Sequence, residues 1–165
     1  MINEARLKKV MEYIQIGRDE GADPVLGGVR LTKGDYGAGF FFQPTIFTGV
    51  EPAMRIAREE IFGPVLSVIS YRDDEDAVRI ANDSDYGLSG SVWTADAARG
   101  LAVARGVRSG SFGINQPYSM DPAAPFGGVK ASGIGRELGR EGLEAYVDLK
   151  AISGAPRTAP VSHGD

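Results

Sequence analysis

Cysteine is absent from the 165 residues, and this absence removes whole classes of chemistry. Without a thiol, the chain has no disulfide, no thiolate metal site and no cysteine nucleophile of its own. Histidine is nearly absent as well, because His163 is the only one and it lies in a polar, proline-rich terminal stretch. Such a stretch is expected to be disordered. We therefore expect neither Ser-His catalysis nor a metal site.

Long apolar runs and basic clusters are also missing. No run approaches the roughly 18 apolar residues that a membrane span needs, and the N-terminus has no secretory pattern. We therefore expect a cytoplasmic protein with no membrane partner. The net charge is −4, with acids and bases interspersed. This pattern argues against a nucleic-acid partner held through its phosphates.

The glycine-rich loops that bind nucleotide phosphates are missing too. There is no GxxxxGK[ST] loop, and the glycines of "GIGRELG" are spaced GxGxxxG, with no convincing strand before them. The dinucleotide phosphate loop requires a different spacing directly after a strand. If this chain contributes to a dinucleotide site, it lacks the main phosphate-binding element.

The hydrophobic spacing that is present predicts helices alternating with strands. Leu7, Val10, Met11 and Ile14 lie on one face of a helix within 2–20. Further helices are expected in the segments 51–60, 73–83, 95–105 and 140–150. Strands are expected in "DPVLGG", "FFQPTIFTGV", "PVLSVIS", "GLSGSVW", "GSFGIN" and, at the end, "AISG". This alternation predicts an α/β fold in which a parallel sheet is flanked by helices.

Several features of these elements are specific enough to be checked. "PVLSVIS" is apolar on both faces, as an interior strand of a parallel sheet should be. Asp73 or Asp74 is expected to cap one helix and Thr94 the next. After Asn115 the regularity lapses into a long connection, residues 116–139, and such irregular stretches are often binding loops.

Glu60 and Phe62, in the stretch "EEIFGPV", form the first pattern that suggests a ligand. On an extended backbone they lie on one side, about 7 Å apart. A carboxylate accepts hydrogen bonds from two adjacent hydroxyls, and a ring provides an apolar wall. Together they match the nicotinamide riboside half of NAD. From spacing alone, a solvated glutamate beside a buried phenylalanine is the simpler interpretation, with Glu59 the more solvated of the two acids.

Five segments, taken in order, resemble the C-terminal part of the aldehyde dehydrogenase superfamily: "EEIFGPV", "ANDSDYGLSGSVWT", "GINQP", "PFGGVKASGIGRELG" and "GLEAYVDLK". The similarity extends from about Ile2 to Gly154. It implies the fold of that C-terminal part of the catalytic domain, with an oligomerisation segment, over residues 1–153. Residues 154–165 are expected to form a disordered tail. The implied activity is NAD(P)-dependent oxidation of an aldehyde to a carboxylic acid.

The resemblance also implies roles for individual residues. Glu60 corresponds to the acid that binds the nicotinamide ribose hydroxyls, and Phe62 to an aromatic residue beside it. The loop from Asn115 to Pro125 corresponds to a lining of the substrate tunnel. The implied substrate-binding residues are Asn115, Tyr118, Met120 and Phe126. Their character favours an apolar or aromatic aldehyde. The implied cofactor is NAD or NADP, bound only in part, and the "LKAISG" segment implies a homo-oligomer.

The family's catalytic residues are not among those matched. Its nucleophilic cysteine, glutamate base, oxyanion asparagine and glycine-rich cofactor turn all lie upstream of the matching region. We therefore assign no catalytic residue here, and we expect the chain to be inactive without the missing N-terminal portion. Two alternatives remain open: a non-catalytic interaction module that associates with full-length aldehyde dehydrogenase subunits, and a standalone domain that binds another diol-bearing ligand.

Overall fold

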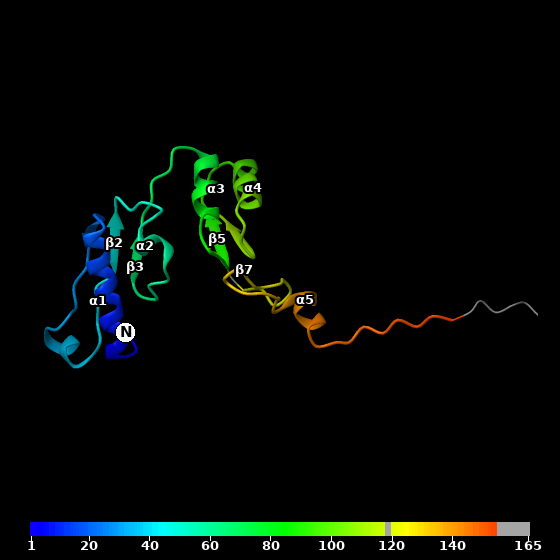
Figure 1. Ribbon diagram of the computed structural model, residues 1–165, viewed down its shortest axis with the longest axis horizontal. Coiled ribbons are helices and arrows are strands. Elements are labelled where there is room, and N and C mark those ends of the chain that lie inside the picture. Colours follow the sequence, from blue (N-terminus) through cyan, green and yellow to red (C-terminus); the bar gives the residue numbers. More distant parts are fainter. Residues whose placement is uncertain (118–119, 155–165) are drawn as a thin grey trace, which may run out of the picture.

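The computed structural model describes residues 1–117 and 120–154 and shows a mixed α/β fold. Small sheets are flanked by helices, which confirms the predicted fold class. In Figure 1 the chain forms a first lobe, residues 1–69, and a second lobe, residues 70–138, followed by an extended C-terminal segment. An ion pair between Arg58 and Asp83 (3.4 Å) joins the two lobes. No helix in the described ranges is both long and apolar enough to cross a membrane.

The first lobe packs a long helix against a three-stranded sheet. Its elements are α1 (Glu4–Asp19), β1 (Asp23–Leu26), the 3₁₀ helix η1 (Gly34–Ala38), β2 (Thr45–Thr48), α2 (Arg55–Arg58) and β3 (Val65–Ser67). The strand order is β1-β2-β3, with β1 antiparallel and β3 parallel to β2. Asn3 begins α1 by accepting a hydrogen bond from the Arg6 amide. The predicted helix is confirmed, although Met11 is exposed on it.

All the buried apolar side chains of the described residues belong to this first lobe. They are Leu7, Val10, Tyr13, Ile14, Ala22, Phe42, Phe47, Val50, Ile56 and Ile61. The prediction of an interior strand at "PVLSVIS" is wrong for the described chain. β3 has only three residues and pairs with β2 alone, so that its Leu66 is exposed.

The second lobe contains two helices and two strand pairs. Its elements are α3 (Asp74–Asn82), β4 (Tyr86–Gly87), β5 (Ser89–Val92), α4 (Ala97–Gly106), β6 (Ser111–Ile114) and β7 (Val129–Lys130). β5 and β6 are parallel, whereas β4 and β7 are antiparallel. β7 lies within the stretch expected to be irregular. The sheet of the fold is therefore present as three separate small sheets.

Of the two helix caps predicted for this lobe, one is confirmed and the other is wrong. Asp73 caps α3, since its side chain accepts a hydrogen bond from the Asp76 amide, as predicted. Thr94 does not cap α4. The cap is Asp96, whose carboxylate accepts from the amides of Ala98 and Arg99.

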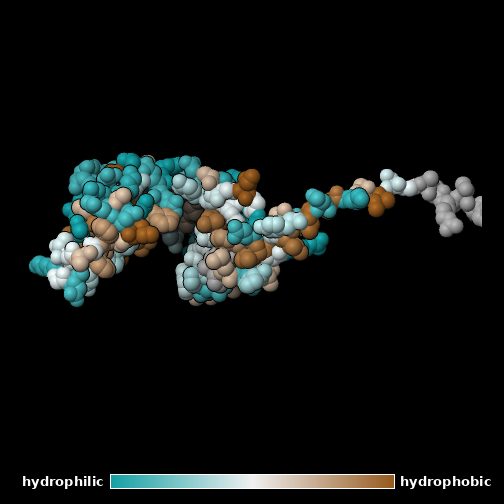
Figure 2. All heavy atoms as spheres, turned by 90° about the horizontal axis from the view of Figure 1, so that it is seen from below, coloured by the Kyte–Doolittle hydropathy of each residue, from teal (hydrophilic) through white to brown (hydrophobic). Residues whose placement is uncertain are grey.

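The C-terminal segment is less regular than predicted. α5 (Gly139–Glu144) has six residues and ends before the predicted helix over 140–150 does, and Tyr146 beyond it is 88% accessible. The strand expected at 151–154 is absent, and no described strand lies beside it to supply hydrogen bonds. Figure 2 shows hydrophobic residues in brown along this exposed segment. The predicted tail from 155 onward lies outside the described residues.

Candidate functional site

Residues 59–62, which we call the acid–aromatic turn, connect α2 to β3. Phe62 has a positive φ of 54°, so the turn is not an extended strand and strict side-to-side alternation does not apply. Glu60 and Phe62 are nevertheless both exposed, whereas Ile61 between them is buried. Phe62 is 72% accessible, which excludes the buried phenylalanine of the simpler interpretation.

The two acids of the turn have opposite surroundings. Tyr13 Oη donates a hydrogen bond to Glu59 Oε2 (2.9 Å), and Arg55 donates to both carboxylate oxygens (2.8 and 2.9 Å). These bonds, those from Arg55 first, lower the pKa of Glu59 to about 2. The expectation that Glu59 is the more solvated acid is therefore wrong. Glu60 makes no hydrogen bond or ion pair among the described residues, and its carboxylate faces solvent.

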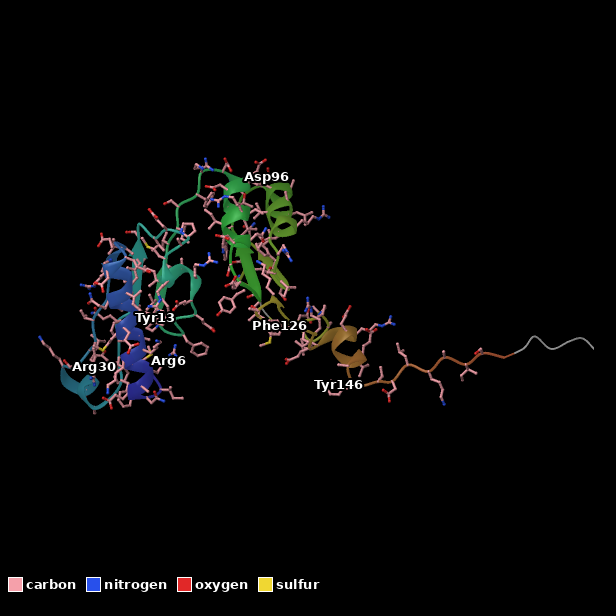
Figure 3. All side chains as sticks on the ribbon, in the orientation of Figure 1. Arg6, Tyr13, Arg30, Asp96, Phe126 and Tyr146 are labelled. Carbon is pink, nitrogen blue, oxygen red and sulfur yellow. The ribbon has the colours of Figure 1, made fainter. Side chains whose placement is uncertain are left out.

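Arg6, on α1, holds the other side of the turn. Its Nε donates to the Phe62 carbonyl oxygen (3.1 Å) and its Nη2 donates to the Ile61 carbonyl oxygen. Its guanidinium carbon also lies 5.3 Å from the centroid of the Phe62 ring. Figure 3 shows Arg6 and Tyr13 along the same helix. The sequence analysis missed both residues, because neither lies near the turn in the sequence.

The substrate-side residues predicted from the resemblance lie in the second lobe. Asn115 has a positive φ of 55°, and both the oxygen and the nitrogen of its side-chain amide bond to Thr94. Its Oδ1 accepts from the Thr94 amide and its Nδ2 donates to the Thr94 carbonyl, both at 2.8 Å. This geometry fixes the start of the loop. Asn115 is exposed, and its amide keeps a second N–H and a second lone pair beyond these two hydrogen bonds. Met120 is 68% accessible, and Tyr118 lies outside the described residues.

Phe126 is half-buried on a tight backbone scaffold. Its amide and carbonyl each form a 2.7 Å hydrogen bond with Glu137, and Arg136 donates to the Gly128 carbonyl at 2.8 Å. Phe126 lines a groove of about 320 Å³, which also includes Leu88 but contains neither Glu60 nor Phe62. The cofactor-side and substrate-side residues therefore lie on separate surfaces, one in each lobe (Figures 1 and 3).

A groove of about 600 Å³ lies in the second lobe. It lies between α3, α4 and the strands β4 and β5, and apolar side chains dominate it, among them Leu88, Trp93 and Phe112. Its charged residues include Asp74 and Arg99, which pair with each other at 2.6 Å. Among the residues that the structure describes, no group of three or more His, Asp or Glu side chains could hold a metal ion.

Comparisons with known proteins agree on one family. The sequence model of the aldehyde dehydrogenase family matches residues 1–152. Geranial dehydrogenase from Castellaniella defragrans is 49% identical over 152 residues, which cover 92% of this chain and 31% of that protein. Betaine aldehyde dehydrogenase from Bacillus subtilis is 41% identical over 162 residues, which cover 98% of this chain and 33% of that protein. The chain thus spans about a third of the length of these curated relatives.

Solved structures are similar in fold as well as in sequence. Betaine aldehyde dehydrogenase from Staphylococcus aureus, in complex with NAD+, has a TM-score of 0.86 and 41% identity, covering 88% of this chain and 29% of that one. The Mycobacterium tuberculosis aldehyde dehydrogenase complexed with NAD+ has a TM-score of 0.83 and 52% identity, and the match covers 88% of this chain and 30% of that one.

Proposed function

The chain belongs to the aldehyde dehydrogenase family, and from this premise we propose that it forms the C-terminal part of an enzyme that oxidises an aldehyde to a carboxylic acid with NAD+. The observation that carries the proposal is the acid–aromatic turn. It presents Glu60 and Phe62 to solvent while the neighbouring Glu59 is engaged by Tyr13 and Arg55. The choice of NAD+ is supported by its presence in both solved relatives described above.

Glu60 and Phe62 have complementary roles in this proposal. The Glu60 carboxylate accepts hydrogen bonds from the two hydroxyls of the nicotinamide ribose, because a carboxylate offers two oxygens at the right separation. Phe62 packs against the same riboside. Covering a ring that is 72% accessible removes apolar surface from water and so favours binding.

Met120 and Phe126, with Tyr118, form the substrate side. Their side chains are apolar or aromatic, which favours an apolar or aromatic aldehyde. Asn115, whose amide is engaged with Thr94, positions the start of this loop. The substrate-binding surface thus rests on the second lobe and the cofactor-binding surface on the first.

The nucleophile is not supplied by this chain, since it contains no cysteine. Thiolate attack on the aldehyde carbon, followed by hydride transfer to NAD+, needs a thiol held next to the nicotinamide. In this proposal that thiol belongs to polypeptide outside the 165 residues. We therefore expect the isolated chain to be inactive.

A chimera tests the proposal. Residues 1–152 replace the matching segment of Castellaniella defragrans geranial dehydrogenase, and NADH formation is followed at saturating aldehyde. We expect turnover, and we expect Glu60→Gln to raise KM for NAD+ by about tenfold, because hydrogen bonds to a charged group are lost. Glu51→Gln, an exposed acid in the same lobe, is the control and should leave KM unchanged. An unchanged KM in Glu60→Gln, or turnover by the isolated chain, would refute the proposal.

A second candidate function is favoured by the exposed apolar side chains of the C-terminal segment. Tyr146, Leu149 and Ile152 are each at least 88% accessible. Such a segment suits a module that associates with full-length aldehyde dehydrogenase subunits, or with copies of itself. Light scattering of the chain mixed with a full-length relative tests this function: a complex of summed mass supports it, and two unchanged species count against it.

A further inference from the structure

We infer that Arg6 is a positioning residue, which holds the acid–aromatic turn in the conformation that receives the nicotinamide riboside. The inference rests on the proposed function and assigns a new role within it. Arg6 acts through Phe62 and Ile61, which it contacts, and reaches the ligand only through them.

A single guanidinium makes three contacts with the turn. Its Nε and Nη2 donate to two successive carbonyl oxygens, those of Phe62 and Ile61, and its guanidinium carbon lies 5.3 Å from the Phe62 ring centroid. Carbonyl bonds fix the backbone, and the ring contact fixes the side chain that the backbone carries. The position of the Phe62 ring therefore depends on Arg6.

The turn needs such support because its backbone conformation is unfavourable. Phe62 has φ of 54°, a region that a bulky L residue seldom adopts unless its surroundings impose it. The following Gly63 lies directly against α1, since a Cβ at that position would be 2.6 Å from Val10 Cγ2. The turn is thus pressed onto the helix that carries Arg6.

Arg6 can hold the turn because the backbone that carries its side chain is itself fixed. Its amide donates to the Asn3 side chain at the start of α1 (2.8 Å), and the next residue, Leu7, is buried in the core. On the opposite side of Glu60, the carboxylate of Glu59 is held by Tyr13 and Arg55. Glu60 therefore lies between two anchored neighbours.

Lysine cannot reproduce this arrangement. The planar guanidinium offers several donors in a fixed fork and stacks on an aromatic face, whereas an ammonium is a compact point charge. Arg6→Lys keeps the charge and the helix propensity but loses the paired donors. It therefore separates the geometry of Arg6 from its charge.

The test uses the full 165-residue chain and nicotinamide mononucleotide as the probe. Hydrogen exchange measured by mass spectrometry follows the peptide that contains residues 59–63, together with peptides from α1, in the presence of increasing nucleotide. We expect wild-type protection of the turn to be saturable. In Arg6→Gln we expect the turn to exchange about tenfold faster and the apparent Kd to rise by about tenfold, because two charge-assisted hydrogen bonds are lost.

Lys8→Gln is the matched control, since Lys8 is an exposed cation on the same helix whose one ion-pair partner among the described residues is Glu4 (3.1 Å). It should leave both exchange and Kd unchanged. If Arg6→Gln also raises the hydrogen exchange of α1, the same measurement on Arg6→Lys decides the question. A higher Kd for the nucleotide with wild-type exchange in α1 supports the inference. A wild-type Kd in Arg6→Lys overturns it.

The outcomes separate the two claims. Saturable wild-type binding with an unchanged Kd in Arg6→Gln overturns the role of Arg6 and leaves the proposed function standing. Wild-type chain whose turn gains no protection from the nucleotide overturns the proposed riboside site, and the inference fails with it.

Discussion

Glu59 and Glu60 are adjacent in the sequence, yet only one of them is available to a ligand. Glu59 is held by Tyr13 from α1 and by Arg55 from α2, whereas the Glu60 side chain is exposed. Arg55 lies four residues before Glu59, a spacing that brings two side chains together on a helix, whereas Tyr13 lies 46 positions away. The sequence pattern nevertheless led to the wrong choice of solvated acid. The engagement of Glu59, which leaves Glu60 as the available acid, therefore combines one local contact and one tertiary contact.

The first prediction at the scale of single residues is that acid destabilises the fold. The pKa values of Glu59 and Asp76 are both lowered to about 2, by Arg55 and Tyr13 in one case and by Arg72 and Arg79 in the other. Carboxylates with lowered folded-state pKa values stabilise the fold above their unfolded pKa values, near 4, and this contribution is lost as the pH falls toward 2. Urea unfolding should therefore give a lower free energy at about pH 3 than at about pH 6.

Glu59→Gln tests the cause of this sensitivity. The neutral amide cannot titrate, so the loss of stability between those two pH values should be smaller than in the wild type. A pH dependence identical to that of the wild type would show that the Arg55 and Tyr13 contacts do not stabilise the charged form.

A second prediction concerns Gly110, where two backbone segments nearly touch. A Cβ at this position would lie 1.5 Å from the carbonyl oxygen of Gly127, next to Phe126. Gly110→Ala should therefore destabilise the second lobe by about 3 kcal/mol, as overpacking against rigid backbone does. Gly154→Ala is the control, because nothing lies within 4 Å of its Cβ position. Equal urea midpoints for the two variants would contradict the close approach.

At the scale of elements, the start of α4 shows how two candidate caps are distinguished. Thr94 and Asp96 are both good capping residues, and the sequence favoured the first. The side chain of Asp96 accepts from two first-turn amides, whereas Thr94 Oγ1 accepts from the Asp96 amide at 3.2 Å and so supports the cap. Figure 3 shows Asp96 at the end of the helix pair.

This difference predicts the effect of removing each side chain. Asp96→Ala should destabilise α4 by about 1 kcal/mol, because two amides lose their partner. Thr94→Ala should destabilise α4 by less than Asp96→Ala does, because it removes a single long hydrogen bond. Hydrogen exchange of α4 measures both, and an Asp96→Ala variant that exchanges more slowly than Thr94→Ala would contradict the assignment.

At the scale of the whole molecule, the described structure has too little core for its length. Every buried apolar side chain of the described residues lies between Leu7 and Ile61. Beyond Ile61, large apolar side chains are exposed, among them Trp93 (67%), Leu149 (99%) and Ile152 (89%). Figure 2 shows hydrophobic residues in brown along the extended C-terminal segment.

We therefore predict that the isolated chain self-associates and binds apolar dyes. Exposed apolar patches on this scale exceed what soluble monomers usually carry. Light scattering and dye fluorescence measure the two effects, and both should fall when a partner that covers the apolar surfaces is added. A monomeric sample with a sharp, reversible thermal transition would contradict the prediction.

The amino-acid sequence by itself determined the positions of α1, α3 and most strands, the Asp73 cap and the absence of thiol chemistry. These features depend on local spacing and composition, which a single stretch of chain contains. Tertiary structure decided the rest. Tyr13 reaches Glu59 across 46 positions and Arg6 reaches Ile61 across 55, so that contacts between distant segments select the exposed acid and set the conformation of Phe62. No local periodicity encodes those contacts, because they exist only after α1 has packed against the sheet.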